Sequence, residues 1–203
     1  QPSVHDDVED CVDDILDELG TDIVVGTQLG IGKPNHILNE LVDRAVANPD
    51  IDLEIWSALA LQNPAGTSDL ESRLVDPLAD RLFGSYPNLR YDELLQSGDL
   101  PDNVAVHKFF IQPGKYTNNP EAQQHHHSVN YTHVFRTFQA AEPNLMLTLL
   151  GVGELDGETR YNLGSNTDLS RDFLTWLEDE RERGRPRRDA REPADLVTSA
   201  RPR

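Results

Sequence analysis

Residues 22–35 read DIVVGTQLGIGKPN, and the architecture of the chain follows from this segment. Residues 22–26 form a short apolar run that is typical of a buried strand, and a glycine-rich loop follows. Pro34 then favours the first turn of a helix, where the absence of its N–H group costs nothing. We expect this helix to present one apolar face, because apolar residues recur at helical spacing: Ile37, Leu38, Leu41, Val42, Ala45 and Val46.

The segments on both sides extend this pattern. Residues 51–61 read as a second strand, which completes the β–α–β unit of a parallel sheet. Upstream, residues 8–19 have helical spacing and end at Gly20. Downstream, a capping box at Ser68–Glu71 predicts a helix that includes Leu74, Leu78 and Leu82, and a short helix is expected at 91–96. We expect strands at 104–111 and 145–152, with a helix after Asn119 between them. A tight turn at Asp156–Gly157 and a last helix after Thr167 follow. The sequence therefore predicts an α/β fold, with a mainly parallel sheet and flanking helices.

The charge of the chain excludes several kinds of partner. The 203 residues include 36 acidic and 18 basic side chains, for a net charge of −18, and only three of the bases are lysines: Lys33, Lys108 and Lys115. Affinity for nucleic acids and anionic lipids comes mainly from basic groups that meet phosphate, so we expect neither as a partner. Residues 1–180 alone carry 32 acids and 10 bases. The scarcity of lysine favours adaptation to high salt, which screens self-repulsion, over an ordinary acidic protein.

Cysteine usage and hydropathy favour a cytoplasmic location. The single cysteine, Cys11, excludes an internal disulfide framework and a cysteine-based zinc site, which fits a reducing compartment. No run approaches the roughly 18 apolar residues needed to cross a bilayer, so we expect no membrane insertion. The first residues also lack the basic start and apolar run of a secretory signal.

The glycine-rich loop is the first candidate site. It is not a Walker loop, because five residues separate Gly26 from Gly32 and Pro34 follows Lys33, and it is not a dinucleotide fingerprint, because Asn35 stands where glycine is required. A glycine loop between a strand and a helix still lets backbone N–H groups face an anion, and Lys33 adds a positive charge. Two interpretations stay open, a strand-to-helix turn or an anion site made of Gly30, Gly32, Lys33, Pro34 and Asn35.

The second candidate site is the polar segment 123–133, which holds four of the seven histidines. Adjacent histidines point to different faces, and no Cys, Asp or Glu follows closely, so a metal site is disfavoured. A polar loop at the mouth of the sheet, able to hydrogen-bond a substrate, fits better. The chain has no Gly-x-Ser-x-Gly elbow, and Cys11 lies in an apolar stripe, so the sequence offers no nucleophile for a catalytic triad.

Several ordered motifs resemble the N-terminal part of the acetyl-CoA hydrolase/CoA-transferase family. They are LGIGKPNH at 29–36, SALAL at 57–61, SDLE at 68–71, FGSYP at 83–87, FFIQPG at 109–114, AQQH at 122–125 and SVNYTHV at 128–134. The resemblance covers residues 8–180. It implies a CoA-transferase-like α/β fold that forms one half of a two-half enzyme.

The resemblance implies chemistry on acyl-CoA thioesters. In that family a glutamate attacks the thioester, which gives an acyl-glutamyl anhydride and then a glutamyl-CoA thioester that water or a carboxylate resolves. The nucleophile lies in the second half of family members. No glutamate of this chain matches it, so no catalytic residue is assigned and the chain alone is expected to be inactive. The implied substrates are acetyl-CoA or another acyl-CoA and acetate or a similar carboxylate, with no permanently bound cofactor and no metal.

The resemblance also implies roles for the two candidate sites. The loop from Gly30 to Asn35 would contact coenzyme A, and polar residues would line the acyl pocket: Gln124, His125, Asn130, Tyr131 and His133. The implied partner is a C-terminal half, encoded separately or lost. The competing interpretation is a non-enzymatic acidic α/β protein that binds an anionic ligand at the Gly30–Asn35 loop.

The end of the chain differs in composition from the rest. We expect one domain over residues 1–183 and an Arg/Pro-rich tail over residues 184–203, because residues 181–203 hold eight arginines and four acids. Three interpretations stay open: a solvated, disordered tail, a basic arm for nucleic acid, and a non-native segment of the kind that GC-rich DNA gives when it is read out of frame.

Overall fold

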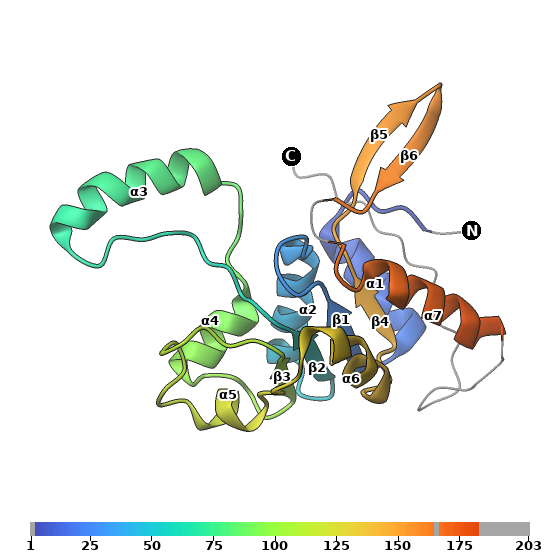
Figure 1. Cartoon of the computed structure of the whole chain (residues 1–203), viewed down its shortest axis with the longest axis horizontal. Coiled ribbons are helices and arrows are strands. Elements are labelled where there is room, and N and C mark those ends of the chain that lie inside the picture. The colour runs from blue at the N-terminus through green and yellow to red at the C-terminus, as the bar shows by residue number, and fades with distance from the viewer. Residues whose placement is uncertain (1–2, 165–166, 183–203) are drawn as a thin grey trace.

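A four-stranded parallel sheet forms the centre of the molecule (Figure 1). The computed structural model describes residues 3–164 and 167–182, so the tail expected at 184–203 and its boundary at 183 lie outside the described residues. The strands are β1 (Asp22–Thr27), β2 (Asp52–Ser57), β3 (Val104–Lys108) and β4 (Leu145–Leu147), in the order β3-β2-β1-β4. Every neighbouring pair in this sheet is parallel, which confirms the predicted α/β fold.

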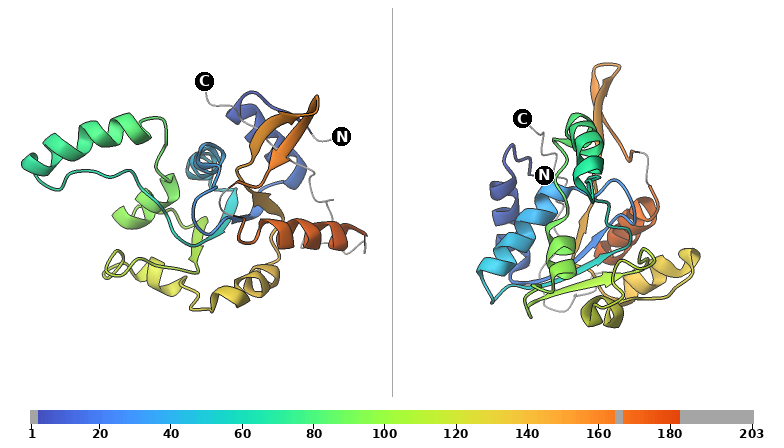
Figure 2. Two further views of the ribbon diagram at one scale, coloured as in Figure 1. Left: turned by 45° about the horizontal axis from the view of Figure 1, so that its top comes forward. Right: turned by 90° about the vertical axis from the view of Figure 1, so that its left-hand side faces the viewer.

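Helices cover both faces of this sheet (Figure 2). On one face, the core includes residues of four helices: α1 (Val8–Leu19), α2 (Asn35–Ala47), α4 (Arg90–Ser97) and α5 (Pro120–Gln124). On the other face, the core includes residues of α6 (Val134–Ala140) and α7 (Ser170–Glu182). Because side chains alternate along a strand, Ile23 and Val25 pack in the first core, whereas Val24 packs with Phe138 and Phe173 in the second. Within the described residues, no helix has the length and hydropathy that a transmembrane span requires.

The first helix and the start of the second follow the local signals in the sequence. The Asp7 carboxylate accepts the N–H of Glu9 at 2.8 Å at the start of α1, and Gly20 ends this helix with a φ of 81°. Pro34 stands immediately before α2, and its carbonyl accepts the N–H of Leu38 at 3.1 Å. Pro34 therefore precedes the first helical turn rather than lying inside it.

The strands β2 and β3 end earlier than the sequence predicts. They were expected to reach Leu61 and Ile111, but they stop at Ser57 and Lys108, which are the last residues paired in register. Beyond this point β1 has already ended, and the N–H of Leu59 donates instead to a carbonyl of the loop that follows β1, at 2.7 Å. The residues after both strands therefore lie along the carboxyl edge of the sheet.

The strand predicted over residues 145–152 is divided in two. β4 pairs with β1 over only three residues, because β1 ends at Thr27. The chain then forms β5 (Gly151–Leu155), which pairs antiparallel with β6 (Glu158–Asn162) in an exposed hairpin. Asp156 and Gly157, with φ values of 55° and 78°, make the tight turn that the sequence predicts.

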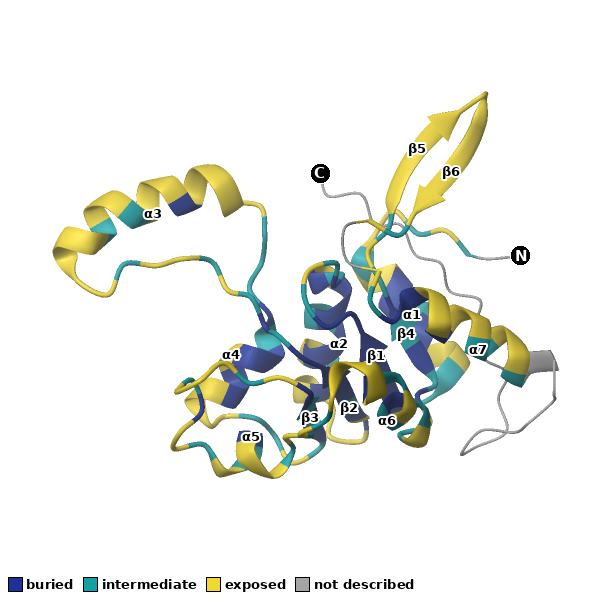
Figure 3. Ribbon diagram, in the orientation of Figure 1, coloured by how far each residue is buried: buried dark blue, intermediate teal, exposed yellow. Residues whose placement is uncertain are grey.

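The helix α3 (Asp69–Phe83) stands away from the rest of the molecule on two extended connections (Figure 1). Ser68 Oγ accepts the N–H of Glu71 at 3.3 Å, as the predicted capping box requires, whereas the Glu71 carboxylate accepts the N–H of Thr67 at 2.9 Å instead of that of Ser68. Most of α3 is exposed (Figure 3), including four leucines at four-residue spacing: Leu70, Leu74, Leu78 and Leu82. The apolar face that the sequence places on this helix is therefore not used by the main core.

Candidate functional site

The carboxyl ends of β1, β2 and β3 border a cavity of about 400 Å³. Its wall is mainly apolar and consists of Leu29, Ala58, Leu59, Phe109, Phe110, Val129 and Val134. Polar groups enter the wall at Gly30, Tyr131 and Asp168. Ligands of α/β proteins bind outside the carboxyl ends of the strands, and an apolar cavity with a few polar groups is the usual form of a small-molecule site. This cavity is therefore the candidate site.

Two residues that the sequence singles out, Gly30 and Tyr131, meet at this cavity. Gly30 comes from the loop after β1, and Tyr131 from a short 3-10 helix (Tyr131–His133) that precedes α6. The Tyr131 hydroxyl donates to the carboxylate of Asp168, and this hydrogen bond raises the pKa of Tyr131 to about 12. Tyr131 is therefore a neutral phenol at physiological pH, and Asp168 adds a carboxylate to the wall.

The ammonium group of Lys33 lies behind the cavity wall. Lys33 Nζ donates to the backbone carbonyls of Gly30 at 2.5 Å and Leu59 at 2.9 Å, and both of these residues line the cavity. Burial, and then the nearby charge of Lys108, lower the pKa of Lys33 to about 7, against the opposing effect of Asp168. Lys33 therefore joins the loop after β1 to the segment after β2, and its charge changes near neutral pH.

Gly32 allows the loop to pass close to Gln28. The φ of Gly32 is +94°, and a Cβ atom there would lie 1.6 Å from Oε1 of Gln28. Gln28 is fully buried, and its Nε2 donates to the hydroxyls of Thr148 at 2.5 Å and Ser170 at 2.8 Å. Only glycine satisfies both the positive φ and the close approach. Gly32 thus shapes the loop without lining the cavity.

Pro34 and Asn35 lie at the start of α2 and also do not line the cavity. Asn35 is buried, and its Nδ2 donates to the carbonyl of Pro87 at 2.8 Å, which ties α2 to the chain that leads into α4. Of the five loop residues that the sequence proposes as an anion site, the structure therefore places Gly30 at the cavity. It gives the other four supporting positions.

The polar residues expected to line an acyl pocket are spread over several surfaces. Tyr131 lines the cavity, whereas the following four do not: Gln124, His125, Asn130 and His133. His125 instead pairs with Glu121 one helical turn earlier, with its Nδ1 2.7 Å from the carboxylate. The other three side chains are exposed to solvent. Polar composition alone indicates a surface loop here, but it does not indicate which side chain faces a ligand.

A buried polar cluster near the same edge of the sheet contains none of the residues that the sequence proposes for a site. Asp92 of α4 is fully buried, and its carboxylate accepts from Lys108 Nζ at 3.0 Å and Lys115 Nζ at 2.8 Å. The Tyr116 hydroxyl donates to the same carboxylate. Burial alone would raise the pKa of Asp92, but the charge of Lys108 and the hydrogen bonds from Lys115 and Tyr116 outweigh it and hold this pKa below its usual value.

All three lysines of the chain gather at this edge of the sheet. Lys33 Nζ donates to the carbonyl of Leu59, and Lys115 Nζ to the carbonyl of Ala60, at 3.4 Å. Lys108 lies close enough to lower the pKa of Lys33 through its charge. In a chain with a net charge of −18, this edge gathers all three lysines, two of which pair with the buried carboxylate of Asp92. The sequence marks these residues only by the small number of lysines. Their spacing along the chain does not predict that all three lie at this edge of the sheet.

A group of aromatic and histidine rings packs beside the edge strand β3. The rings of Trp56 and His107 stack with their centroids 4.1 Å apart, and His107 Nδ1 lies 3.0 Å from His127 Nε2. Burial, and then the charges of His125 and His127, lower the pKa of His107 to about 4. His107 is therefore neutral at physiological pH.

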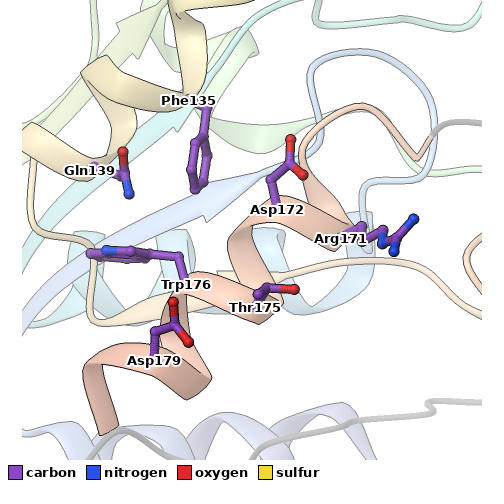
Figure 4. A pocket seen from close by; sticks show the side chains of 7 residues that line it. All are labelled: Phe135, Gln139, Arg171, Asp172, Thr175, Trp176 and Asp179. Carbon is purple, nitrogen blue, oxygen red and sulfur yellow. The ribbon is translucent and has the colours of Figure 1, made fainter. Parts of the chain in front are cut away.

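A second cavity, of about 510 Å³, lies between α6 and α7 (Figure 4). Figure 4 shows the rings of Phe135 and Trp176 facing one another across it, whereas Arg171 is directed away from both rings. No candidate residue of the sequence lines this cavity. The first cavity, where segments from distant parts of the chain meet at the sheet edge, is therefore the stronger candidate.

Comparisons of the chain with protein-family models, with curated proteins and with solved structures find no match. Over residues 3–164 and 167–182, no three side chains of His, Cys, Asp or Glu form a group that could hold a metal ion. The chain is an α/β protein with a parallel sheet, and its candidate site is an apolar cavity at the carboxyl edge of that sheet, backed by a buried lysine.

Proposed function

We propose that the chain is the N-terminal part of an acetyl-CoA hydrolase or acetate CoA-transferase, with a CoA-transferase-like fold, and that its cavity receives the acyl group of a CoA thioester. One observation carries the proposal. Four motifs of the family resemblance, at 29–36, 57–61, 109–114 and 128–134, contribute every cavity-lining residue except Asp168. These motifs are far apart in the chain, so their meeting at one apolar cavity supports a shared role in binding.

The attacking glutamate lies outside this chain in the proposed reaction. One of its carboxylate oxygens attacks the thioester carbonyl carbon, the C–S bond breaks, and coenzyme A leaves as a thiolate, which gives an acyl-glutamyl anhydride. The thiolate then attacks the glutamyl carbonyl of the anhydride and releases the carboxylic acid as its anion. Water or another carboxylate finally resolves the glutamyl-CoA thioester.

The contribution of this chain is binding and positioning. The apolar wall around Ala58 and Phe109 would hold the acyl group and exclude water from it. The backbone of Gly30 and the hydroxyl of Tyr131 offer polar contacts to the rest of the thioester. Lys33 would keep the loop of Gly30 at a fixed distance from the segment of Leu59.

The exposed face of α3 supports a further polypeptide in the assembly. Its four leucines, Leu70, Leu74, Leu78 and Leu82, are each more than half exposed. Exposed apolar surface of this kind marks contact sites in many proteins. We infer that the C-terminal half, which would carry the glutamate, contacts this face.

Equilibrium binding of acetyl-CoA to the purified 203-residue chain tests the proposal. We expect calorimetry in molar KCl to detect binding that Ala58→Phe abolishes, because the larger side chain fills the cavity. Ala47→Phe is the matched control, since Ala47 is exposed at the end of α2. Absence of binding to the folded wild-type chain would contradict the proposal, and hydrolysis of acetyl-CoA by this chain alone would contradict the position of the nucleophile.

A second candidate function is the non-enzymatic binding of an anionic ligand at the Gly30–Asn35 loop. The gathering of Lys33, Lys108 and Lys115 at the adjacent sheet edge favours it. The two functions differ in what they require of the cavity. Binding of acetate or phosphate as tight as that of acetyl-CoA, and unaffected by Ala58→Phe, would favour the second function.

A further inference from the structure

We propose that the cavity between α6 and α7 binds a small organic cation through an alkylated ammonium group. This cavity is separate from the one at the carboxyl edge of the sheet, so the inference goes beyond the proposed function and does not depend on it. Three features carry it: two aromatic rings that face one another, two carboxylates on the same face of one helix, and the direction of the basic side chain beside them.

Two aromatic rings from neighbouring helices line the cavity. Phe135 of α6 and Trp176 of α7 are both half-buried, and Figure 4 shows their rings on opposite sides of the space. The Trp176 ring packs edge-on against the ring of Phe173, with centroids 5.3 Å apart and planes at 67°. Phe173 is fully buried in the core of this face of the sheet. The core therefore fixes the orientation of the tryptophan ring and leaves part of the ring open to the cavity.

Two carboxylates flank the tryptophan on the same face of α7. Asp172 and Asp179 line the cavity, and they stand four residues before and three residues after Trp176. Residues three and four positions apart are neighbours on one side of a helix, so Trp176 lies between the two acidic side chains. On α6, Gln139 follows Phe135 by four residues and adds an amide group to the opposite wall. The cavity thus combines aromatic rings with negative charge.

The basic side chain at this cavity does not point between the rings. Among the described residues that line the cavity, Arg171 is the one with a positive charge, and Figure 4 shows its guanidinium group directed away from Phe135 and Trp176. An anion that entered the cavity would meet the carboxylates of Asp172 and Asp179, which disfavour it. The charge of the cavity therefore selects a cation and disfavours polyanions such as coenzyme A thioesters.

The aromatic rings favour an alkylated ammonium group over an alkali metal ion. The face of an aromatic ring attracts a cation, and aromatic cages use this attraction to hold quaternary ammonium groups. A small metal ion must first lose tightly held water, which costs free energy that two rings do not return. An alkylated ammonium group spreads its charge over methyl groups, and these also make apolar contacts with the rings. The volume of about 510 Å³ lies within the range of small-molecule sites, about 300–1,000 Å³.

Titration of the 203-residue chain with choline, followed by NMR in molar KCl, tests the inference. Choline should bind, and its methyl protons should show nuclear Overhauser effects to the ring protons of Trp176. The high salt screens diffuse attraction to an acidic surface, so binding that persists there reports on close contacts. The neutral alcohol in which carbon replaces the nitrogen of choline has the same shape, and it should bind about tenfold more weakly or worse. No binding of choline, or equal binding of the neutral alcohol, would overturn the inference.

Two substitutions locate the binding. Trp176→Leu removes one ring and should weaken choline binding by about tenfold. Thr175→Arg places a positive charge at the cavity from an exposed position and removes no packed side chain, so it serves if Trp176→Leu does not fold. Thr159→Arg is the matched control, because Thr159 is exposed on β6 and the net charge changes equally. Equal affinity of choline for the two arginine variants would overturn the inference.

The two cavities are tested independently of one another. Ala58→Phe fills the cavity at the sheet edge and should leave the affinity for choline within twofold of the wild-type value. Loss of choline binding in a folded Ala58→Phe variant would overturn the inference, because it would place choline in that other cavity. Absence of acetyl-CoA binding contradicts the proposed function alone, whereas absence of choline binding contradicts this inference alone.

Discussion

The ammonium nitrogen of Lys108 lies 3.0 Å from Oδ1 of Asp92, and both side chains are at least 99% buried. Lys115 Nζ lies 2.8 Å from the other oxygen of the same carboxylate. The removal of one member of a buried ion pair leaves its partner charged and without a counter-ion, which costs far more than the pair contributes in net stability. Asp92 therefore holds two ammonium groups in the interior of an acidic protein.

The first prediction is that Asp92→Asn lowers the free energy of unfolding by about 3–5 kcal/mol, measured by urea denaturation. Asp43→Asn is the matched control, because Asp43 forms an exposed pair with Arg90, at 3.3 Å. This control should change stability by less than about 0.5–1 kcal/mol. Equal effects of the two substitutions would show that Asp92 does not hold a buried pair.

The second prediction concerns the close approach of Gly32 to Gln28. Gly32→Ala should lower the free energy of unfolding more than Gly98→Ala, because both glycines have a positive φ but only Gly32 has a neighbouring atom where the new methyl group would lie. The positive φ alone costs about 1–2 kcal/mol for alanine, and Gly98→Ala measures that part.

A double-mutant cycle isolates the contact itself. Gln28→Ala removes the atom that a Cβ at Gly32 would meet, so the two substitutions together should cost at least about 1 kcal/mol less than the sum of the single effects. Additive effects would indicate that the loop moves to accommodate the methyl group without meeting Gln28.

Sequence patterns predict the parts of this fold that depend on neighbouring residues. The strand at 22–27, the helix that follows Pro34 and the turn at Asp156–Gly157 are local features, set by apolar periodicity, a fixed proline φ and residues that tolerate a positive φ. The ends of β2 and β3 are not local. The end of β2 depends on where β1 stops, and the end of β3 on where β2 stops, so the sequence places both ends three or four residues too late.

The same distinction explains what the sequence predicts of the site. Gly30 and Tyr131 belong to segments with a recognisable composition, and the structure brings both to the cavity. Asp92 gives no such signal, because it lies in an ordinary amphipathic helix and its partners Lys108 and Lys115 are 16 and 23 residues away. Asp92, Lys108 and Lys115 come together only when α4 packs against the sheet.

The third prediction concerns acid sensitivity at His107. Its pKa in the folded protein is about 4, below the usual value of 6.5, so the folded state binds fewer protons than the unfolded chain between these values. The stability that depends on neutral His107 is therefore present above about pH 6.5 and is lost as the pH falls towards 4, by up to about 3 kcal/mol. We expect His107→Phe to reduce this loss when unfolding is measured from pH 7 to pH 4.

His36→Phe is the matched control for that measurement. His36 is exposed on α2, so this variant makes the same change of side chain without removing a packed histidine. The many acidic groups of the protein also titrate in this range, and the comparison of the two variants removes their common contribution. The same pH profile for both variants would contradict the role of His107.

The fourth prediction concerns anion binding near Lys33. Its pKa of about 7 results from burial and from Lys108, opposed by Asp168 and Asp92, so Lys33 is charged at pH 6 and largely neutral at pH 9. If its charge attracts a carboxylate, the affinity for acetate should fall by about tenfold or more between these pH values, as expected for the loss of a charge-assisted hydrogen bond. Acetate itself stays ionised throughout, so the change reports on the protein.

Lys33→Gln separates this effect from the titration of other groups. The amide retains a donor for the carbonyl of Gly30 but carries no charge, so the variant should bind acetate weakly and with little dependence on pH. Calorimetric titrations at pH 6 and pH 9 on both proteins measure the difference. An equal fall in affinity for the variant would assign the pH dependence to another group.

The fifth prediction concerns the leucines of α3. Leu74 and Leu78 are 75% and 55% exposed, so Leu74→Ala and Leu78→Ala should each change the free energy of unfolding by no more than about 0.5 kcal/mol. Leu41→Ala is the matched control in α2, where the side chain is 1% exposed, and it should cost about 2–5 kcal/mol.

The same variants show what the exposed face contacts. If α3 contacts another molecule through these leucines, Leu74→Ala and Leu78→Ala should weaken the association of the purified chain, measured by sedimentation. They should leave its free energy of unfolding unchanged. Leu41→Ala should instead lower the free energy of unfolding. A cost of 2 kcal/mol or more in the α3 variants would contradict this assignment, because it would mean that the helix packs against the rest of the chain. An unchanged stability together with an unchanged association would contradict a contact through this face of α3.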